Sequence, residues 1–129
     1  MKRSELFHQS LNEALPGSVE ELSRFLGNAI TQLPIAALNL RGSDHKSGYN
    51  LIASATDGFE LILTCITILE DCSSQSKGEL ARLRISLCES LECMNTFMEQ
   101  QSRIDIADLI EFELVVILTE IHTFIFDEP

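Results

Sequence analysis

Apolar residues recur every three or four positions through most of the chain, which is the spacing of an amphipathic helix. The pattern is broken by polar or turn-forming stretches at residues 16–17, 41–50, 72–78 and 100–102. Between them it predicts main helices at residues 18–40, 49–71, 79–101 and 103–126, after a short helical N-terminal arm, residues 1–17. Short connectors favour antiparallel neighbours. We therefore expect one all-α domain over residues 1–129, an up-and-down four-helix bundle (residues 18–127) crossed by the arm.

The predicted last helix, residues 103–126, carries more apolar residues than one face can hold. A broad stripe should face the core: Ile106, Ile110, Leu114, Ile117, Ile121, Phe124 and Ile125. Leu109, Phe112 and Val116 lie on a second side. Its β-branched residues favour a strand, but an uninterrupted segment of this length favours a helix. A helix that is apolar on two sides must be covered on two sides.

The second side, Leu109, Phe112 and Val116, is therefore the candidate partner-binding or dimer surface. A homodimer with antiparallel last helices would bury it, and so would an amphipathic helix from a protein partner. The arm is the alternative cover within the same chain, through Leu6, Phe7 and Leu11.

The net charge of the chain limits the classes of partner that it is expected to bind. Nine Lys and Arg residues face twenty Asp and Glu residues, a formal net charge of −11 that repels phosphate backbones and anionic lipid headgroups. We expect no binding to nucleic acid or membrane, and Glu111, Glu113 and Glu120 exclude the last helix as a membrane span. The N-terminus lacks the apolar core of a signal peptide, so the expected compartment is the cytoplasm.

Two polar stretches mark helix boundaries. Ser18 and Glu21 have the spacing of a capping box at the start of a helix. Residues 41–50 are the clearest predicted loop and include Gly-Ser-Asp-His. Although this loop is the first place to look for a site, adjacent hydroxyl, carboxylate and imidazole groups do not make a catalytic triad. We interpret it as an exposed polar connector.

No pattern of metal-binding or catalytic residues emerges. Cys65, Cys72, Cys88 and Cys93 match no zinc spacing and are predicted to be reduced structural thiols. A di-iron bundle would need two Glu-x-x-His pairs, and the chain has one, Glu5-Leu-Phe-His8, in the arm. Glu113 is expected to pair with Arg82 or Arg84, or to reach solvent. We predict no enzyme activity, no metal and no cofactor.

Two classes of function remain. The first is a non-enzymatic interaction module, adaptor or chaperone-like, which binds an amphipathic partner segment or self-associates. Its architecture is comparable to small bundles such as flagellar and secretion chaperones, although no motif marks membership. The alternative is a bundle that encloses a small apolar ligand, in a cavity lined by Phe59, Phe112, Phe124 and the Met residues.

Overall fold

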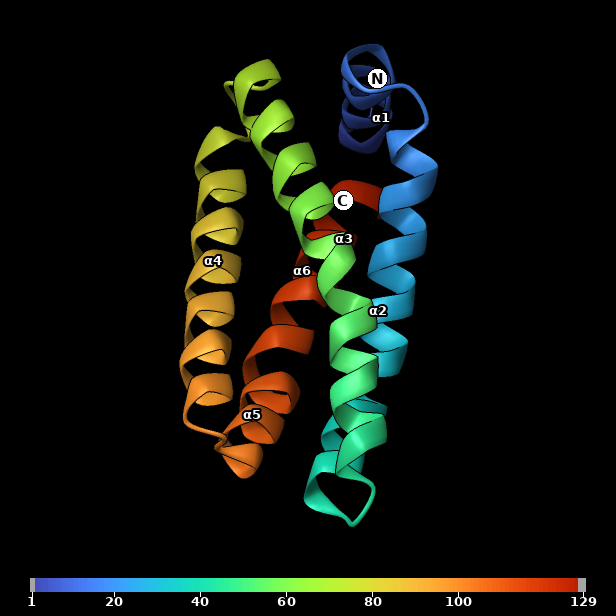
Figure 1. The fold of residues 1–129 in the computed structure, drawn as a ribbon. Coiled ribbons are helices and arrows are strands. Elements are labelled where there is room, and N and C mark those ends of the chain that lie inside the picture. The colour runs from blue at the N-terminus through green and yellow to red at the C-terminus, as the bar shows by residue number, and fades with distance from the viewer. Residues whose placement is uncertain (1, 128–129) are drawn as a thin grey trace.

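A computed structural model describes residues 2–127, and within that range every regular element is a helix. The elements are α1 (Arg3–Ala14), α2 (Ser18–Arg41), α3 (His45–Cys72), α4 (Lys77–Glu99), α5 (Arg103–Leu109), the π-helix η1 (Ile110–Leu114) and α6 (Val115–Phe126). The last three follow one another without a break, and we refer to them together as the last helix. The structure confirms the predicted all-α bundle (Figure 1).

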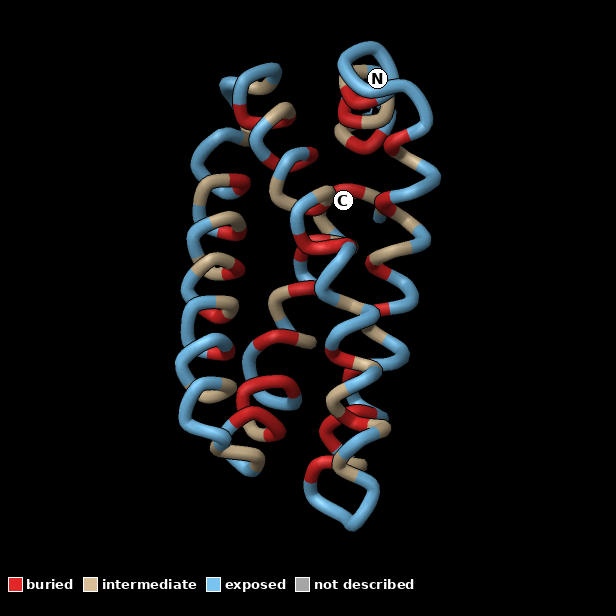
Figure 2. Tube along the Cα trace, viewed as in Figure 1, coloured by how far each residue is buried: buried red, intermediate tan, exposed pale blue. Residues whose placement is uncertain are grey.

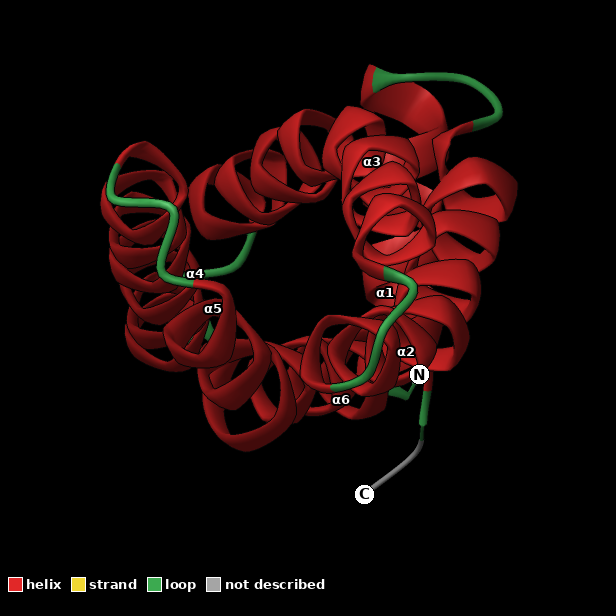
Figure 3. Cartoon of the chain, turned by 60° about the horizontal axis from the view of Figure 1, so that its bottom comes forward, coloured by secondary structure: helices red, strands yellow, loops and turns green. Residues whose placement is uncertain are grey.

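The four long rods form a closed ring. α2 contacts α3 and the last helix, and α4 contacts the same two elements from the other side. Figure 3, which shows the bundle nearer to end-on, displays this ring, and Figure 1 shows that successive rods alternate in direction. α3 therefore lies diagonally opposite the last helix, and the two share no contact in the described chain.

The core fills the inside of this ring, and Figure 2 shows that the buried positions follow the inward side of each rod. Leu22, Leu33, Ile66, Leu87 and Ile121 are completely buried and come from all four rods. By length and composition α3 is the one described helix that could cross a bilayer. Core helices of water-soluble proteins pass the same test, and α3 is packed between α2 and α4.

The arm closes one end of the bundle. Phe7 and Leu11 of α1 are buried, and the Phe7 ring lies 5.8 Å from the ring of Phe124 near the end of α6. The Ser18 hydroxyl donates to the carbonyl of Leu11 at 3.2 Å. The predicted capping box is therefore wrong, because Gly17 occupies the N-cap position of α2 and Ser18 turns back to hold the arm.

The connector predicted at residues 41–50 is too long, because only residues 42–44 separate α2 from α3, which begins at His45. Asp44 caps the helix by accepting a hydrogen bond from the Ser47 amide at 3.3 Å, and Nε2 of His45 lies 2.6 Å from the Gly42 carbonyl oxygen. Gly48 is buried one turn later against α2. The polar residues read as a loop are instead a helix cap followed by a packed first turn.

Close contact between α2 and α3 depends on a missing side chain. A Cβ at Gly58 would lie 2.4 Å from Cδ1 of Phe25 and 3.1 Å from its Cβ, so the Phe25 ring fills the space beside Gly58. A glycine inside a helix lowers stability by about 1 kcal/mol relative to alanine. Here the packing of Phe25 offsets that cost.

The ion pairs differ from those expected for Glu113. Arg84 instead binds the buried Glu70 of α3, with Nε 2.7 Å and Nη2 3.2 Å from the two carboxylate oxygens. Arg82 is held by Glu79 and by Glu120 of α6. Glu113 itself is exposed, the solvent-facing outcome of the two considered. The pairing failed because α4 turns Arg84 toward α3 and away from the last helix.

Gly58→Ala should have opposite effects in two backgrounds. In the natural sequence we expect a loss of about 1–3 kcal/mol of unfolding free energy, because the new methyl group collides with Phe25. In a Phe25→Ala background the same change should stabilise by up to about 1 kcal/mol. Gly27→Ala is the matched control, since nothing lies within 4 Å of its added Cβ and it should stabilise in both backgrounds. Urea unfolding measures all four changes, and a stabilising Gly58→Ala in the natural sequence would contradict the packing argument.

The thiols should react in an order set by burial. Burial raises the pKa of the Cys65 thiol to about 11, and the negative charge of Glu21 adds to this shift. Cys72 and Cys93 are exposed, and Cys88 is intermediate. With Ellman's reagent at neutral pH we expect Cys72 and Cys93 to react first and Cys65 to react only after denaturation. Fewer than four thiols in fresh denatured protein would contradict the expected reduced state.

Candidate functional site

Several large apolar side chains remain in water, and half of them gather on two neighbouring rods. Leu38 is 69% exposed and Ile35 44% on α2, while Phe112 is 67% exposed and Val116 48% on the last helix. Val115 is half-buried beside them. We call these five residues the apolar strip. Contiguous exposed apolar surface on a protein commonly marks an interaction site.

A groove runs between the two halves of the strip. It has a volume of about 270 Å³ and is lined by Pro34, Ala37, Leu38, Arg41, Glu111 and Val115. Leu38 and Val115 thus face one groove from opposite rods. Phe112 and Val116 are one position further round the last helix, and because they are four residues apart they lie on the same side of it.

The π-helix determines which residues of the last helix face outward. The Val115 amide donates to the carbonyl of Ile110, five residues earlier, where an α-helix would use a partner four residues earlier. Ile106, Ile110, Leu114 and Leu118 are all buried and stand four residues apart. In a regular α-helix each such step drifts by about 40°, so the four positions would spread over about 120°. The wider turn compensates for part of this drift.

The structure also changes which residues belong to the predicted surface site, because of this wide turn. Leu109 is 3% exposed and belongs to the core, so it cannot join Phe112 and Val116 in a surface contact. On the core side of the helix Leu118 is buried, whereas Ile117, which was expected in the core stripe, is half-buried. The prediction assumed regular helical periodicity throughout. That prediction overlooked one signal: Ile106, Ile110, Leu114 and Leu118 are separated by three successive intervals of four residues.

The arm does not cover the strip. Phe7 and Leu11 pack at the opposite end of the last helix, against the region of Phe124, and α1 has no contact with η1. Leu6 is half-exposed at that same end. Within residues 2–127, no other segment of the chain covers Phe112.

Acidic side chains flank the half of the strip that lies on the last helix. Arg41 Nη2 lies 2.7 Å from Oδ1 of Asp108 and 2.9 Å from Oε2 of Glu111. The hydrogen bond that Arg41 donates to Asp108 is the main cause of the raised pKa of Arg41; desolvation lowers this pKa, and the charges of both carboxylates raise it further. Asp105 and Glu113 form no ion pair with any described residue, so the border of the strip keeps an excess of negative charge.

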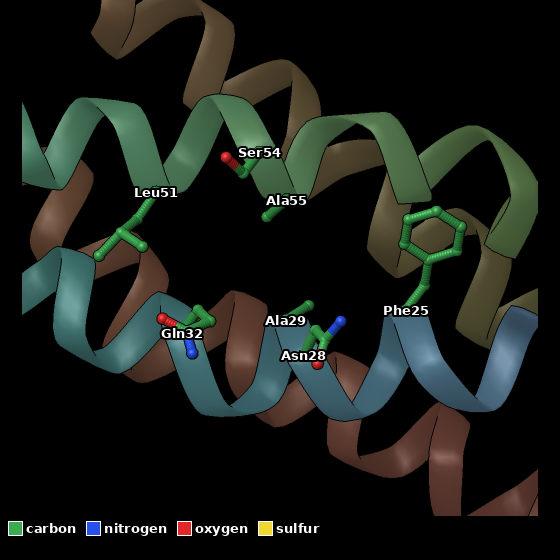
Figure 4. A pocket seen from close by; sticks show the side chains of 7 residues that line it. All are labelled: Phe25, Asn28, Ala29, Gln32, Leu51, Ser54 and Ala55. Carbon is green, nitrogen blue, oxygen red and sulfur yellow. The ribbon is translucent and has the colours of Figure 1, made fainter.

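Further grooves lie elsewhere. One of about 360 Å³ lies between α2 and α3 (Figure 4), with Phe25 at one end and Leu51 at the other, and Asn28, Gln32 and Ser54 between them. It is open and has no charged lining. Another, of about 520 Å³, lies where α1 meets the start of α4. Its Arg3 is already engaged, with its guanidinium 3.9 Å above the Phe124 ring.

The groups considered for other chemistry are scattered. No cluster of three or more His, Cys, Asp or Glu side chains suited to a metal occurs among the described residues. His8 packs with its ring 5.0 Å from that of Phe126. Phe59 is buried in the core whereas Phe112 is on the surface, so the aromatic residues suggested for a ligand cavity do not line one space.

Comparisons with known proteins place the chain in a family. No match was found among curated proteins or among solved structures. One family model, described as "Domain of unknown function (DUF8042)", matches residues 17–124. That match includes all four rods and the whole apolar strip and leaves out most of the arm. The chain therefore belongs to the family described as Domain of unknown function (DUF8042).

Proposed function

We propose that the protein is a non-enzymatic interaction module that binds an apolar segment of a protein partner at the apolar strip. The observation that carries this proposal is the exposure of Phe112 and Leu38, at 67% and 69%, on two rods that flank one groove. Side chains of this size are usually left in water only singly. Here Leu38 lines a groove together with Val115, and Phe112 lies one position further round the last helix.

The shape of the strip suits a helix from the partner. Two antiparallel rods with a groove between them can accept the apolar face of an amphipathic helix, whose anchors recur at positions i, i+3, i+4 and i+7. Leu38 lines this groove from α2 and Val115 lines it from the last helix, while Phe112 and Val116 lie beside it on the exposed side of the same helix. This proposal is a refined form of the adaptor or chaperone-like function expected from the sequence.

The energetic scale suits a reversible complex. Complete burial of Phe112, Leu38 and Val116 would contribute about 1.5–3 kcal/mol for each side chain. Association costs about 4–15 kcal/mol in lost freedom of motion, so these anchors alone give modest affinity. A partner must therefore add polar or charged contacts around the strip to bind tightly.

Binding should depend on the strip and not on exposed apolar residues in general. The probe is a fluorescent helical peptide with Leu at i, i+3, i+4 and i+7 and Gln at its other positions. Phe112→Ser combined with Val116→Ser should weaken its binding at least about tenfold, because two anchors are lost. Leu6→Ser, half-exposed on the arm, is the control and should leave binding unchanged. Fluorescence anisotropy gives the affinities, and equal affinity for natural and double-variant protein would refute the proposed site.

Stability measurements should separate the two sides of the last helix. Leu109→Ala should cost about 2–5 kcal/mol because it leaves a cavity in the core. Phe112→Ala should change stability by less than about 0.5 kcal/mol, because its ring makes few contacts in the free protein. Urea unfolding followed by circular dichroism checks both. A large loss on changing Phe112 would show that another surface already covers it.

A further inference from the structure

We infer that the occupant of the apolar strip is a basic amphipathic helix, with Lys or Arg residues on both borders of its apolar face. This inference rests on the proposed function and specifies the chemistry of the partner. It follows from where the carboxylates of the last helix lie relative to Phe112 and Val116.

Carboxylates flank Phe112 and Val116 on both sides of the last helix. Glu111 lines the groove on the α2 side and shares Arg41 with Asp108. On the α4 side, Glu120 pairs with Arg82, and Glu113 is next to Phe112 on the side away from Glu111. A helix placed along Phe112 and Val116 would therefore have negative charge along both of its edges.

A further carboxylate extends this border toward the start of the last helix. Asp105 precedes Phe112 by seven residues, which places it on the same side of the rod two turns earlier. It is exposed, and like Glu113 it forms no ion pair with a described residue. These two groups are thus available to Lys or Arg from a partner without breaking any internal bridge.

The cations next to the strip are already committed. Arg41 binds Asp108 and Glu111, and Arg82 binds Glu79 and Glu120. Five carboxylates on the last helix (Asp105, Asp108, Glu111, Glu113 and Glu120) thus outnumber the two arginines that reach them. Each carboxylate can accept more than one hydrogen bond, so even the paired ones can receive another donor.

The same arrangement disfavours a second copy of the chain. A two-fold symmetric dimer places one patch against itself, so each acidic border would meet an acidic border. Of the other cations, Lys2 precedes α1, Arg24 lies in the first half of α2, and Lys46 and Lys77 lie at the starts of α3 and α4. Arg3 and Arg84 are engaged in contacts of their own. Arg103 donates to the carbonyl of Leu40. A basic partner meets none of this repulsion.

The test uses three peptides that share one apolar face. They carry Leu at i, i+3, i+4 and i+7, and their remaining positions are Lys, Gln or Glu. We expect the Lys peptide to bind about tenfold more tightly than the Glu peptide, with the Gln peptide between them, which is the scale of a few exposed ion pairs. Raising the salt from 0.05 M to 0.5 M should remove most of this preference, because the screening length falls to a few ångströms.

Charge variants show whether the preference arises at the strip. Asp105→Asn with Glu113→Gln removes two charges there and should reduce the preference for the Lys peptide severalfold. Asp57→Asn with Glu60→Gln removes the same two charges from the exposed side of α3, diagonally opposite, and should have little effect. Equal losses in the two variants would mean general attraction to an acidic protein and would overturn the inference.

The outcomes distinguish this inference from the proposed function. If the Lys and Glu peptides bind equally and Phe112→Ser weakens both, the strip is a binding site but its partner is not basic. If no peptide binds, the proposed function itself fails, and the inference fails with it. If sedimentation shows a dimer that Phe112→Ser converts to a folded monomer, the occupant is a second copy and the basic partner is overturned.

Discussion

The wide turn at Ile110–Leu114 sets which side chains of the last helix reach the core. Because Ile106, Ile110, Leu114 and Leu118 must all face inward, the rod accommodates an extra residue in one turn. Leu109 then joins the core, and Phe112 with Val116 is left on the outside. The wide turn therefore removes Leu109 from the surface, whereas Phe112 and Val116 lie outside the core in a regular helix as well.

Both α2 and the last helix contribute the apolar and charged residues of the strip and its surroundings. α2 contributes Leu38 and the arginine that holds Asp108 and Glu111, and the last helix contributes Phe112 and Val116. The proposed helix-binding function rests on the apolar part of this surface, and the inferred basic partner rests on its charged border. The arm, packed at the other end against Phe124, leaves the strip open.

Periodicity in the sequence was sufficient to predict the four rods, because their apolar residues follow regular helical spacing. It failed where local geometry departs from the regular helix or where a polar residue has a packing role. Leu109 was predicted to lie on the surface because the wide turn was not anticipated. Residues 45–50 were predicted to be a loop, although Asp44 caps a helix there. Arg84 was considered as a partner of Glu113 but binds Glu70. Phe112 and Val116 were identified as surface candidates because they lie opposite the core in either geometry.

In the free protein the strip is uncovered, and we propose that a basic helix covers it on binding. The chain has no Trp, so Phe112→Trp introduces a single fluorophore at the strip. The account predicts long-wavelength emission and strong acrylamide quenching at every protein concentration. Addition of the Lys peptide should then shift the emission to shorter wavelength and protect the indole. An indole that is already protected in dilute free protein, or that stays fully quenchable with peptide bound, would contradict the account.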